Sequence, residues 1–165
     1  MSLLSDFLFA VWGAVIAVCD CRSRRVSNAL VVTGLVAALA CAALDHDPFN
    51  ISLAQAALGA LVGLCALLPF FALGVMGAAD VKVFAVLGAW CGMHALPGLW
   101  IAASLMAGCH AVWLLIATRT QLAAIGRQGE PTFELGGRRA TPYAACLTVS
   151  AIAWMGLHLL AAGVK

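Results

Sequence analysis

The sequence has 165 residues, of which 64% are hydrophobic and only 10% are charged, and its mean hydropathy is +1.05. A soluble domain averages about 45–50% apolar and about 25% charged residues, so this composition excludes an ordinary soluble domain and also an intrinsically disordered chain. The formal net charge of +2 excludes nothing by itself, because its meaning depends on where the charges lie.

Six apolar spans follow one another along the chain. They cover about residues 3–18, 27–44, 51–73, 81–96 and 99–117, and the sixth follows Pro142-Tyr143 and runs to about residue 162. Six helices of about 20 residues each would cross a bilayer core of about 30 Å and use roughly 120 residues. We therefore predict an all-α membrane protein with about six transmembrane helices, in which residues 1–165 form a single polytopic domain without a separate soluble domain. The long apolar runs argue against a β-barrel, whose strands alternate.

The basic residues predict the orientation. Cytoplasmic loops of membrane proteins carry an excess of Lys and Arg. In this chain the first, third and fifth connections hold Arg22, Arg24, Arg25, Lys82, Arg119, Arg127, Arg138 and Arg139, and only Lys165 falls on the other side. We therefore expect these three connections in the cytoplasm and both termini on the outer side.

Cysteine and histidine give no sign of a metal or disulfide site. Seven cysteines, an odd number that lies mostly within apolar runs, do not form a disulfide pattern, and there is no Cys-x-x-Cys pair. The four histidines have no metal-ligand spacing to a carboxylate or a cysteine. We expect no metal and no cofactor, and nothing beyond the basic loops indicates nucleic-acid binding.

Two aspartates are the candidate chemical groups. Asp20 ends the first span and Asp80 begins the fourth, so the predicted topology places both on the cytoplasmic face at similar depth. Two carboxylates a few ångströms apart share a proton, and one can then activate water while the other protonates a carbonyl oxygen. An alternative stays open: Asp80 could cap a helix, and Asp20 could be a solvated partner of the neighbouring arginines.

Two motifs around these aspartates resemble those of the prepilin peptidases, a family of intramembrane aspartyl proteases. Residues 74–82, Gly-Val-Met-Gly-Ala-Ala-Asp-Val-Lys, look like the family's Gly-x-Gly-Asp-Val-Lys signature. Residues 20–28, Asp-Cys-Arg-Ser-Arg-Arg-Val-Ser-Asn, resemble its first motif, and Thr141-Pro142-Tyr143 is a weaker match to the turn into its last helix. Ala79 stands where the family usually has glycine, and Ser27 where it has proline.

The resemblance implies an endopeptidase that cleaves the leader from prepilins or pilin-like proteins at the cytoplasmic face of a prokaryotic cytoplasmic membrane. The chain looks more like the short branch that serves Flp-type pili in tight-adherence systems. It lacks the Cys-x-x-Cys insertion of longer members, so N-methylation is not expected. The implied partners are the prepilin, membrane lipid and the pilus machinery. The implied catalytic residues are Asp20 and Asp80, and the implied substrate-binding or supporting residues are Gly77, Ala79, Lys82 and Asn28.

Two other functions stay open from the sequence. The departure at Ala79 is compatible with a non-catalytic membrane component of a pilus or secretion machine. Carboxylates in membranes also form proton relays, which would suit a proton-linked transporter. No inverted repeat supports the transporter, and both aspartates lie near one predicted surface.

Overall fold

A computed structural model describes residues 3–23, 25–124 and 142–163, and its regular elements are all helices. The predicted all-α class is therefore confirmed for the described residues. In chain order the helices are α1 (Leu3–Ser23), α2 (Asn28–Ala43), α3 (Leu53–Ala72), α4 (Ala78–Cys91), α5 (Leu96–Ala124) and α6 (Tyr143–Gly163).

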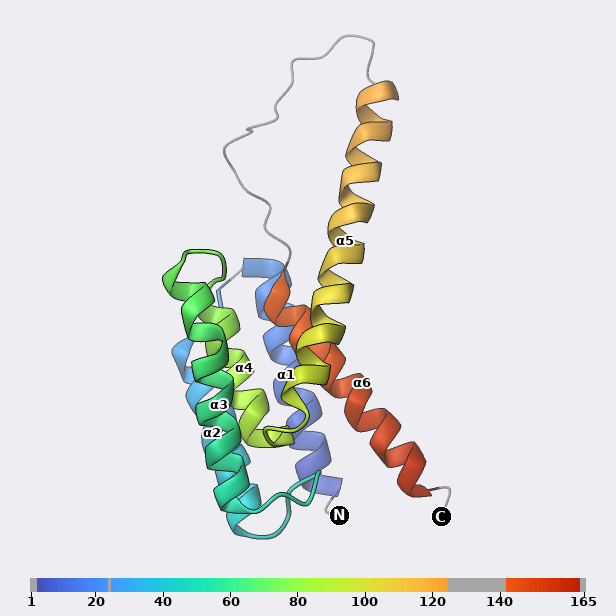
Figure 1. The fold of residues 1–165 in the computed structure, drawn as a ribbon. Helices are drawn as coiled ribbons and strands as arrows, with labels where there is room; N and C mark the ends of the chain where they lie inside the picture. Colours follow the sequence, from blue (N-terminus) through green and yellow to red (C-terminus); the bar gives the residue numbers. More distant parts are fainter. Residues whose placement is uncertain (1–2, 24, 125–141, 164–165) are drawn as a thin grey trace.

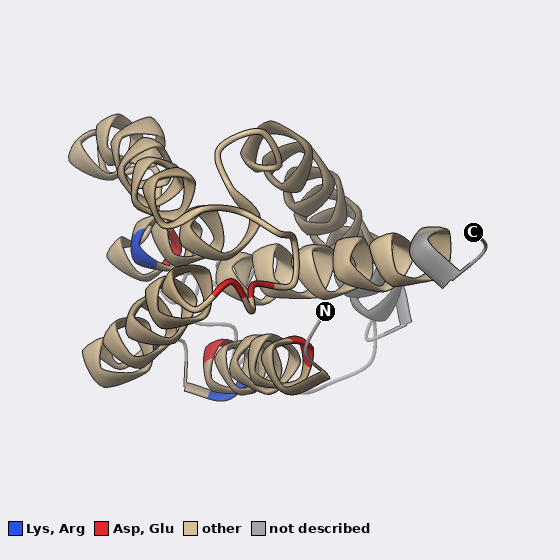
Figure 2. Cartoon of the chain, turned by 90° about the horizontal axis from the view of Figure 1, so that it is seen from below, with Lys and Arg blue, Asp and Glu red and all other residues tan. Residues whose placement is uncertain are grey.

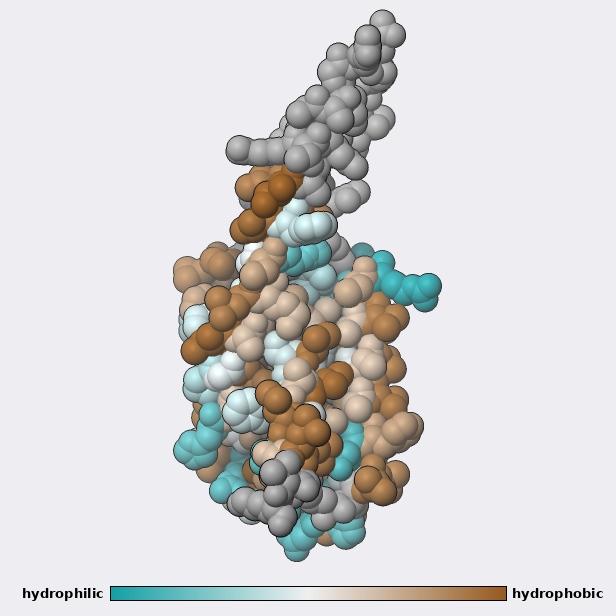
Figure 3. Space-filling view, turned by 90° about the vertical axis from the view of Figure 1, so that its right-hand side faces the viewer, coloured by the Kyte–Doolittle hydropathy of each residue, from teal (hydrophilic) through white to brown (hydrophobic). Residues whose placement is uncertain are grey.

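The helices run alternately in opposite directions, so the two ends of the chain lie at the same end of the bundle (Figure 1). Four of them, α1, α3, α5 and α6, are long and apolar enough to cross a membrane, whereas α2 has 16 residues and α4 has 14. Brown and tan apolar residues dominate the flank seen in Figure 3, and the teal hydrophilic residues gather mostly toward its two ends. The exact number of spans and the side of the membrane that the termini face stay predictions.

Several helix boundaries follow from capping chemistry. Ser27 and Ser52 each accept a hydrogen bond from the backbone three residues later, which satisfies one of the free amides of a helix start. The turn between α4 and α5 lies earlier in the chain than expected from the spans predicted at residues 81–96 and 99–117. Gly92 ends α4 with a φ of 74°, and Pro97 lies inside the first turn of α5, where its missing N–H is not needed.

Helix α1 also differs, because it continues past the apolar span to Ser23 and so includes Asp20. Arg22 and Arg25 lie at this end of α1, and Lys82 lies in the second turn of α4 at the same end of the bundle. Acidic residues mark the opposite end, on the connection between α2 and α3 (Figure 2). Of the basic residues used for orientation, the structure describes Arg119 only as part of α5, and Arg24, Arg127, Arg138, Arg139 and Lys165 lie outside the described residues.

Helix α4, which carries Asp80, is the most enclosed helix of the bundle. It is buried on nearly all sides from Val81 to Cys91 and packs against α2, α3 and α6. Gly59 and Gly63, four residues apart on α3, face the backbone of Phe84 and Gly88 on α4, also four residues apart. A Cβ on Gly88 would lie 2.1 Å from the Gly59 oxygen, so the two backbones are in direct contact. Small residues at this spacing are what close helix packing in membranes requires.

We predict that Gly88→Ala destabilises the protein by about 1–3 kcal/mol or more, because the added methyl must push α3 and α4 apart. Gly108→Ala on α5 is the matched control, since a Cβ there meets nothing within 4 Å. It should leave stability unchanged or raise it by roughly 0.5–1 kcal/mol through helix propensity. Thermal unfolding in detergent micelles measures both, and equal unfolding temperatures for the two variants would contradict the contact.

A second acidic pair lies at the end of the bundle that carries the termini. Asp47, on the connection between α2 and α3, is 2% exposed, and its Oδ1 accepts a hydrogen bond of 2.8 Å from the Phe49 amide. Its Oδ2 and the Oδ1 of Asp6 on α1 are buried and have no hydrogen-bond partner among the described residues. Burial, and to a smaller degree the charge of Asp6, raises the pKa of Asp47 to about 6 although two backbone hydrogen bonds lower it. The carboxyl of Asp47 therefore keeps its proton to a higher pH than an exposed aspartate does.

This raised pKa predicts how stability depends on pH. A carboxyl whose pKa is higher in the folded than in the unfolded state contributes stability below its unfolded pKa, near 4, and loses it as the pH rises through about 6. Asp47→Asn keeps an oxygen for the Phe49 amide but cannot ionise. We expect this variant to unfold at a higher temperature than the wild type at pH 7.5 and at a similar temperature at pH 4.5. If the wild type instead became more stable than Asp47→Asn as the pH rose, the raised pKa of Asp47 would be contradicted.

Candidate active site

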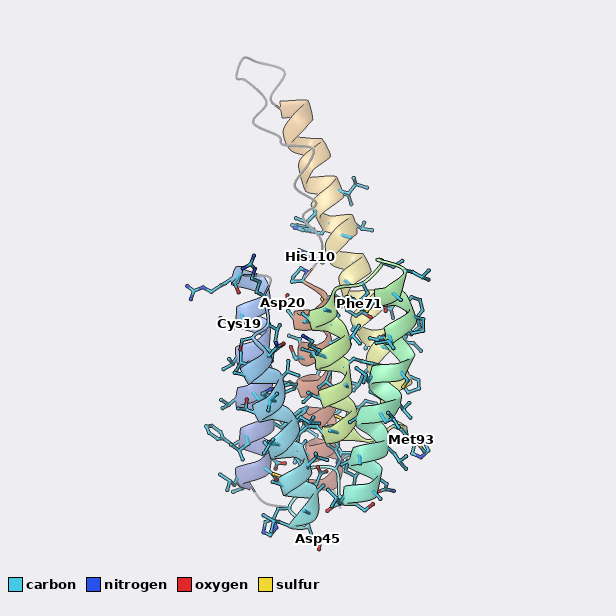
Figure 4. All side chains as sticks on the ribbon, turned by 90° about the vertical axis from the view of Figure 1, so that its left-hand side faces the viewer. Cys19, Asp20, Asp45, Phe71, Met93 and His110 are labelled. Carbon is cyan, nitrogen blue, oxygen red and sulfur yellow. The ribbon has the colours of Figure 1, made fainter. Side chains whose placement is uncertain are left out.

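The first predicted catalytic residue, Asp20, lies near the C-terminal end of α1 and points into the bundle. Figure 4 shows it at the same end as Phe71 of α3, opposite to Asp45 and Met93. Asp20 is only 6% exposed, and its Oδ2 accepts a hydrogen bond of 2.9 Å from the backbone amide of Ala145, in the first turn of α6. It is therefore not the solvated surface residue of the alternative interpretation.

The second predicted catalytic residue, Asp80, lies in the first turn of α4, outside the four helices that are long enough to span a membrane. Its Oδ2 accepts a hydrogen bond of 3.2 Å from the amide of Gly77, the N-cap residue of α4. The capping role considered from the sequence is thus present. Asp80 is also half-buried and accepts a hydrogen bond from the backbone of Ala144, so capping is only part of its environment.

The two carboxylates meet at one turn of α6. Ala144 and Ala145 are consecutive residues. The Ala144 amide forms a hydrogen bond with Asp80, and the Ala145 amide donates one to Asp20. Burial first, and the charge of Asp20 second, raises the pKa of Asp80 to about 6, while the hydrogen bonds from Gly77 and Ala144 lower it. The pair therefore has the electrostatic coupling expected of two carboxylates that cannot both ionise easily.

In the glycine-rich segment before Asp80, the missing side chain of Gly77 leaves space for the carboxylate. Gly77 has an extended backbone with a φ of −74°, and a Cβ on it would lie 3.2 Å from Oδ2 of Asp80, so a side chain here would crowd the carboxylate. Ala79, where the family usually has glycine, has a helical backbone in the first turn of α4 and does not have a positive φ. The methyl group of Ala79 therefore causes no backbone strain.

The two supporting polar residues contact each other. Lys82 Nζ donates a hydrogen bond of 2.8 Å to Oδ1 of Asn28, the first residue of α2. This bond links the two sequence motifs, because it joins the start of α2 to the second turn of α4. Ser27, which stands where the family has proline, is the N-cap of α2.

Sequence reasoning missed the amides of Ala144 and Ala145. Backbone donors leave no signature in a sequence, and the one signal in this region was the weak match at Thr141-Pro142-Tyr143. Of these three residues, Thr141 lies outside the described residues. No group of three or more His, Cys, Asp or Glu within the described ranges could hold a metal ion.

The arrangement suits acid–base chemistry. It has one carboxyl with a raised pKa beside a second carboxylate, at one end of an apolar bundle, and both are oriented by fixed amide donors. A pair of this kind can take a proton from water and give another to a carbonyl oxygen.

The sequence is similar to a known protein family. The sequence profile of the type IV leader peptidase family matches residues 7–112, a range that contains Asp20, Asn28, Asp80 and Lys82. No curated protein and no solved structure matches the chain. Because the matched range is well over half of the sequence, the chain belongs to the type IV leader peptidase family.

Proposed function

We propose that the protein is an aspartyl endopeptidase that removes the leader peptide from prepilins or pilin-like proteins, with Asp20 and Asp80 as its catalytic pair. The observation that carries this proposal is that both carboxylates bind adjacent amides of one helix turn. They do so in a chain of the leader peptidase family, and each lies in a motif that resembles one of the prepilin peptidases.

The raised pKa of Asp80 assigns the two roles in this proposal. Asp80, which keeps its proton up to about pH 6, gives that proton to the scissile carbonyl oxygen. Asp20 takes a proton from the attacking water, whose oxygen bonds to the carbonyl carbon. The C–N bond then breaks as Asp20 passes its proton to the leaving nitrogen, and a hydroxyl of the tetrahedral intermediate returns a proton to Asp80.

The proposed location of the reaction follows from the charges. Arg22, Arg25 and Lys82 lie at the end of the bundle that holds the aspartates, and this basic end would face the cytoplasm of a prokaryotic cell. We assign the chain to the short branch that serves Flp-type pili, with no N-methylation and with the pilus assembly machinery as a partner.

Gly77, Ala79, Lys82 and Asn28 have supporting roles in the proposal. Gly77 leaves space for the Asp80 carboxylate, and Ala79 lets an extended substrate pass close to the start of α4. The hydrogen bond between Lys82 and Asn28 holds the two motifs together. Metal and cofactor have no part in the proposed reaction.

We predict that Asp20→Asn and Asp80→Asn each lower prepilin cleavage by at least about 100-fold, because each removes one partner of the proton transfers. Purified wild type and variants in detergent micelles are incubated with a prepilin, and the masses of the products report the cleavage site and any methylation. Asp45→Asn is the matched control. It removes an exposed carboxyl at the opposite end of the bundle and should cleave like the wild type.

Cleavage at the wild-type rate by either Asp20→Asn or Asp80→Asn would reject the catalytic pair. A wild type that does not cleave any prepilin, while remaining folded, would instead favour the non-catalytic pilus component.

The role of Asp80 also predicts a pH profile. If its protonated form donates to the substrate, kcat should fall as the pH rises through about 6, since the fraction of protonated Asp80 falls. Cleavage of a prepilin peptide at saturating concentration between pH 4.5 and 8 measures this limb. A rate that rises through pH 6 would reverse the two roles and make Asp80 the base.

A further inference from the structure

The first turn of α6 controls both carboxylates. The first amides of a helix have no acceptor within the helix, so they are free to bind other groups. In α6, the Ala145 amide donates to Asp20 at 2.9 Å and the Ala144 amide donates to Asp80. Any movement of this turn therefore displaces the donors of both carboxylates together.

Tyr143 ties this turn to α5. It is the first residue of α6, and its hydroxyl forms a hydrogen bond of 2.9 Å with the hydroxyl of Ser104 on α5. Both side chains are half-buried, and the two residues are 39 positions apart in the sequence. Tyr143 also lies close enough to Asp80 for the two groups to interact electrostatically.

This bond lies where α5 meets the site. Helix α5 packs mainly against α6 and makes few contacts with α4, so α6 is its main connection to the helices that carry Asp20 and Asp80. Farther along α6, the hydroxyls of Thr148 and Ser150 donate to carbonyls of α6 itself and do not tie the helix to α5. Tyr143 therefore fixes the start of α6 in a way that these hydroxyls do not.

We propose that Tyr143, held by Ser104, is a positioning residue that keeps the first turn of α6 where its two amides can bind Asp80 and Asp20. The inference rests on the proposed function of the two aspartates. Without the Tyr143 hydroxyl, the turn loses its hydrogen bond to Ser104, and its amides bind the carboxylates less tightly.

Tyr143→Phe tests this, because it removes only the hydroxyl. We expect kcat for prepilin cleavage to fall about tenfold, the size of one lost hydrogen bond, with KM changed less than about twofold. The falling limb of the pH profile should move up by roughly 0.5 pH unit. The Ala144 amide lowers the pKa of Asp80, so a weaker hydrogen bond from this amide lets that pKa rise.

Three companion variants separate positioning from general loss of structure. Ser104→Ala should reproduce the changes of Tyr143→Phe, and the double variant should be no worse than either single one, because both remove the same bond. Ser150→Ala is the control: it removes a buried hydroxyl that bonds within α6 and should leave the pH limb in place. Thermal unfolding checks that each variant is folded.

A titration without substrate keeps this test separate from the proposed function. The chain has only seven acidic residues, so few carboxyls contribute to the infrared band of protonated carboxyls. The difference in this band between wild type and Asp80→Asn reports the titration of Asp80 together with its coupling to Asp20. Its midpoint should rise in Tyr143→Phe and Ser104→Ala whether or not the protein cleaves prepilins. The inference would be overturned if this midpoint did not change in Tyr143→Phe and Ser104→Ala. It would also be overturned if the kcat losses of the two single variants multiplied in the double variant, or if Ser150→Ala shifted the midpoint equally.

Discussion

Backbone amides at helix starts hold the two carboxylates, and the geometry of the site depends on this interaction. An apolar bundle has few other hydrogen-bond donors for a buried carboxylate. A buried carboxylate without a donor is much higher in free energy than one in water. Asp20 and Asp80 receive amides from the first turn of α6, and Asp80 receives another from the start of α4. The helix starts also carry partial positive charge, which favours the ionised form of a carboxyl. The bundle therefore tolerates two acidic groups at one end because two helices begin there.

The acidic pair at the opposite end, Asp47 and Asp6, is less completely hydrogen-bonded. Asp47 binds the Phe49 amide through one oxygen, but its second oxygen and one oxygen of Asp6 are buried without a partner among the described residues. Both Asp47 and Asp80 have a pKa raised to about 6, chiefly by burial, and in each case a second aspartate adds to the effect. The two ends are thus similar in electrostatics and differ in organisation: at one end adjacent amides of a single turn serve both carboxylates, and at the other the pair is incompletely hydrogen-bonded.

Much of this could be read from the sequence, and the failures have a common cause. The apolar runs predicted where the helices lie, and the charge pattern predicted that Asp20 and Asp80 share one end of the bundle, which the structure places together. The predicted spans leave Pro97 in the connection between α4 and α5, although proline also suits the first turn of a helix, where the structure places it. The amides of Ala144 and Ala145 could not be predicted, since a backbone donor has the same chemistry at every residue and only tertiary packing selects it. Asp47 was not singled out for the same reason, because nothing local distinguishes a buried loop aspartate from a solvated one.

The two departures from the family motifs fall at positions where the structure can absorb them. Ser27 replaces a proline at the residue before α2, and its hydroxyl caps the helix, so the start of α2 is fixed by a hydrogen bond where a proline would restrict φ. Ala79 replaces a glycine at a position with a helical backbone, where alanine is favoured over glycine by roughly 0.5–1 kcal/mol. Gly77, in contrast, faces the Asp80 carboxylate, and a Cβ there would lie 3.2 Å from its oxygen. The glycine that this site needs is therefore the one that the chain retains, and the loss of the other is no physical argument against activity.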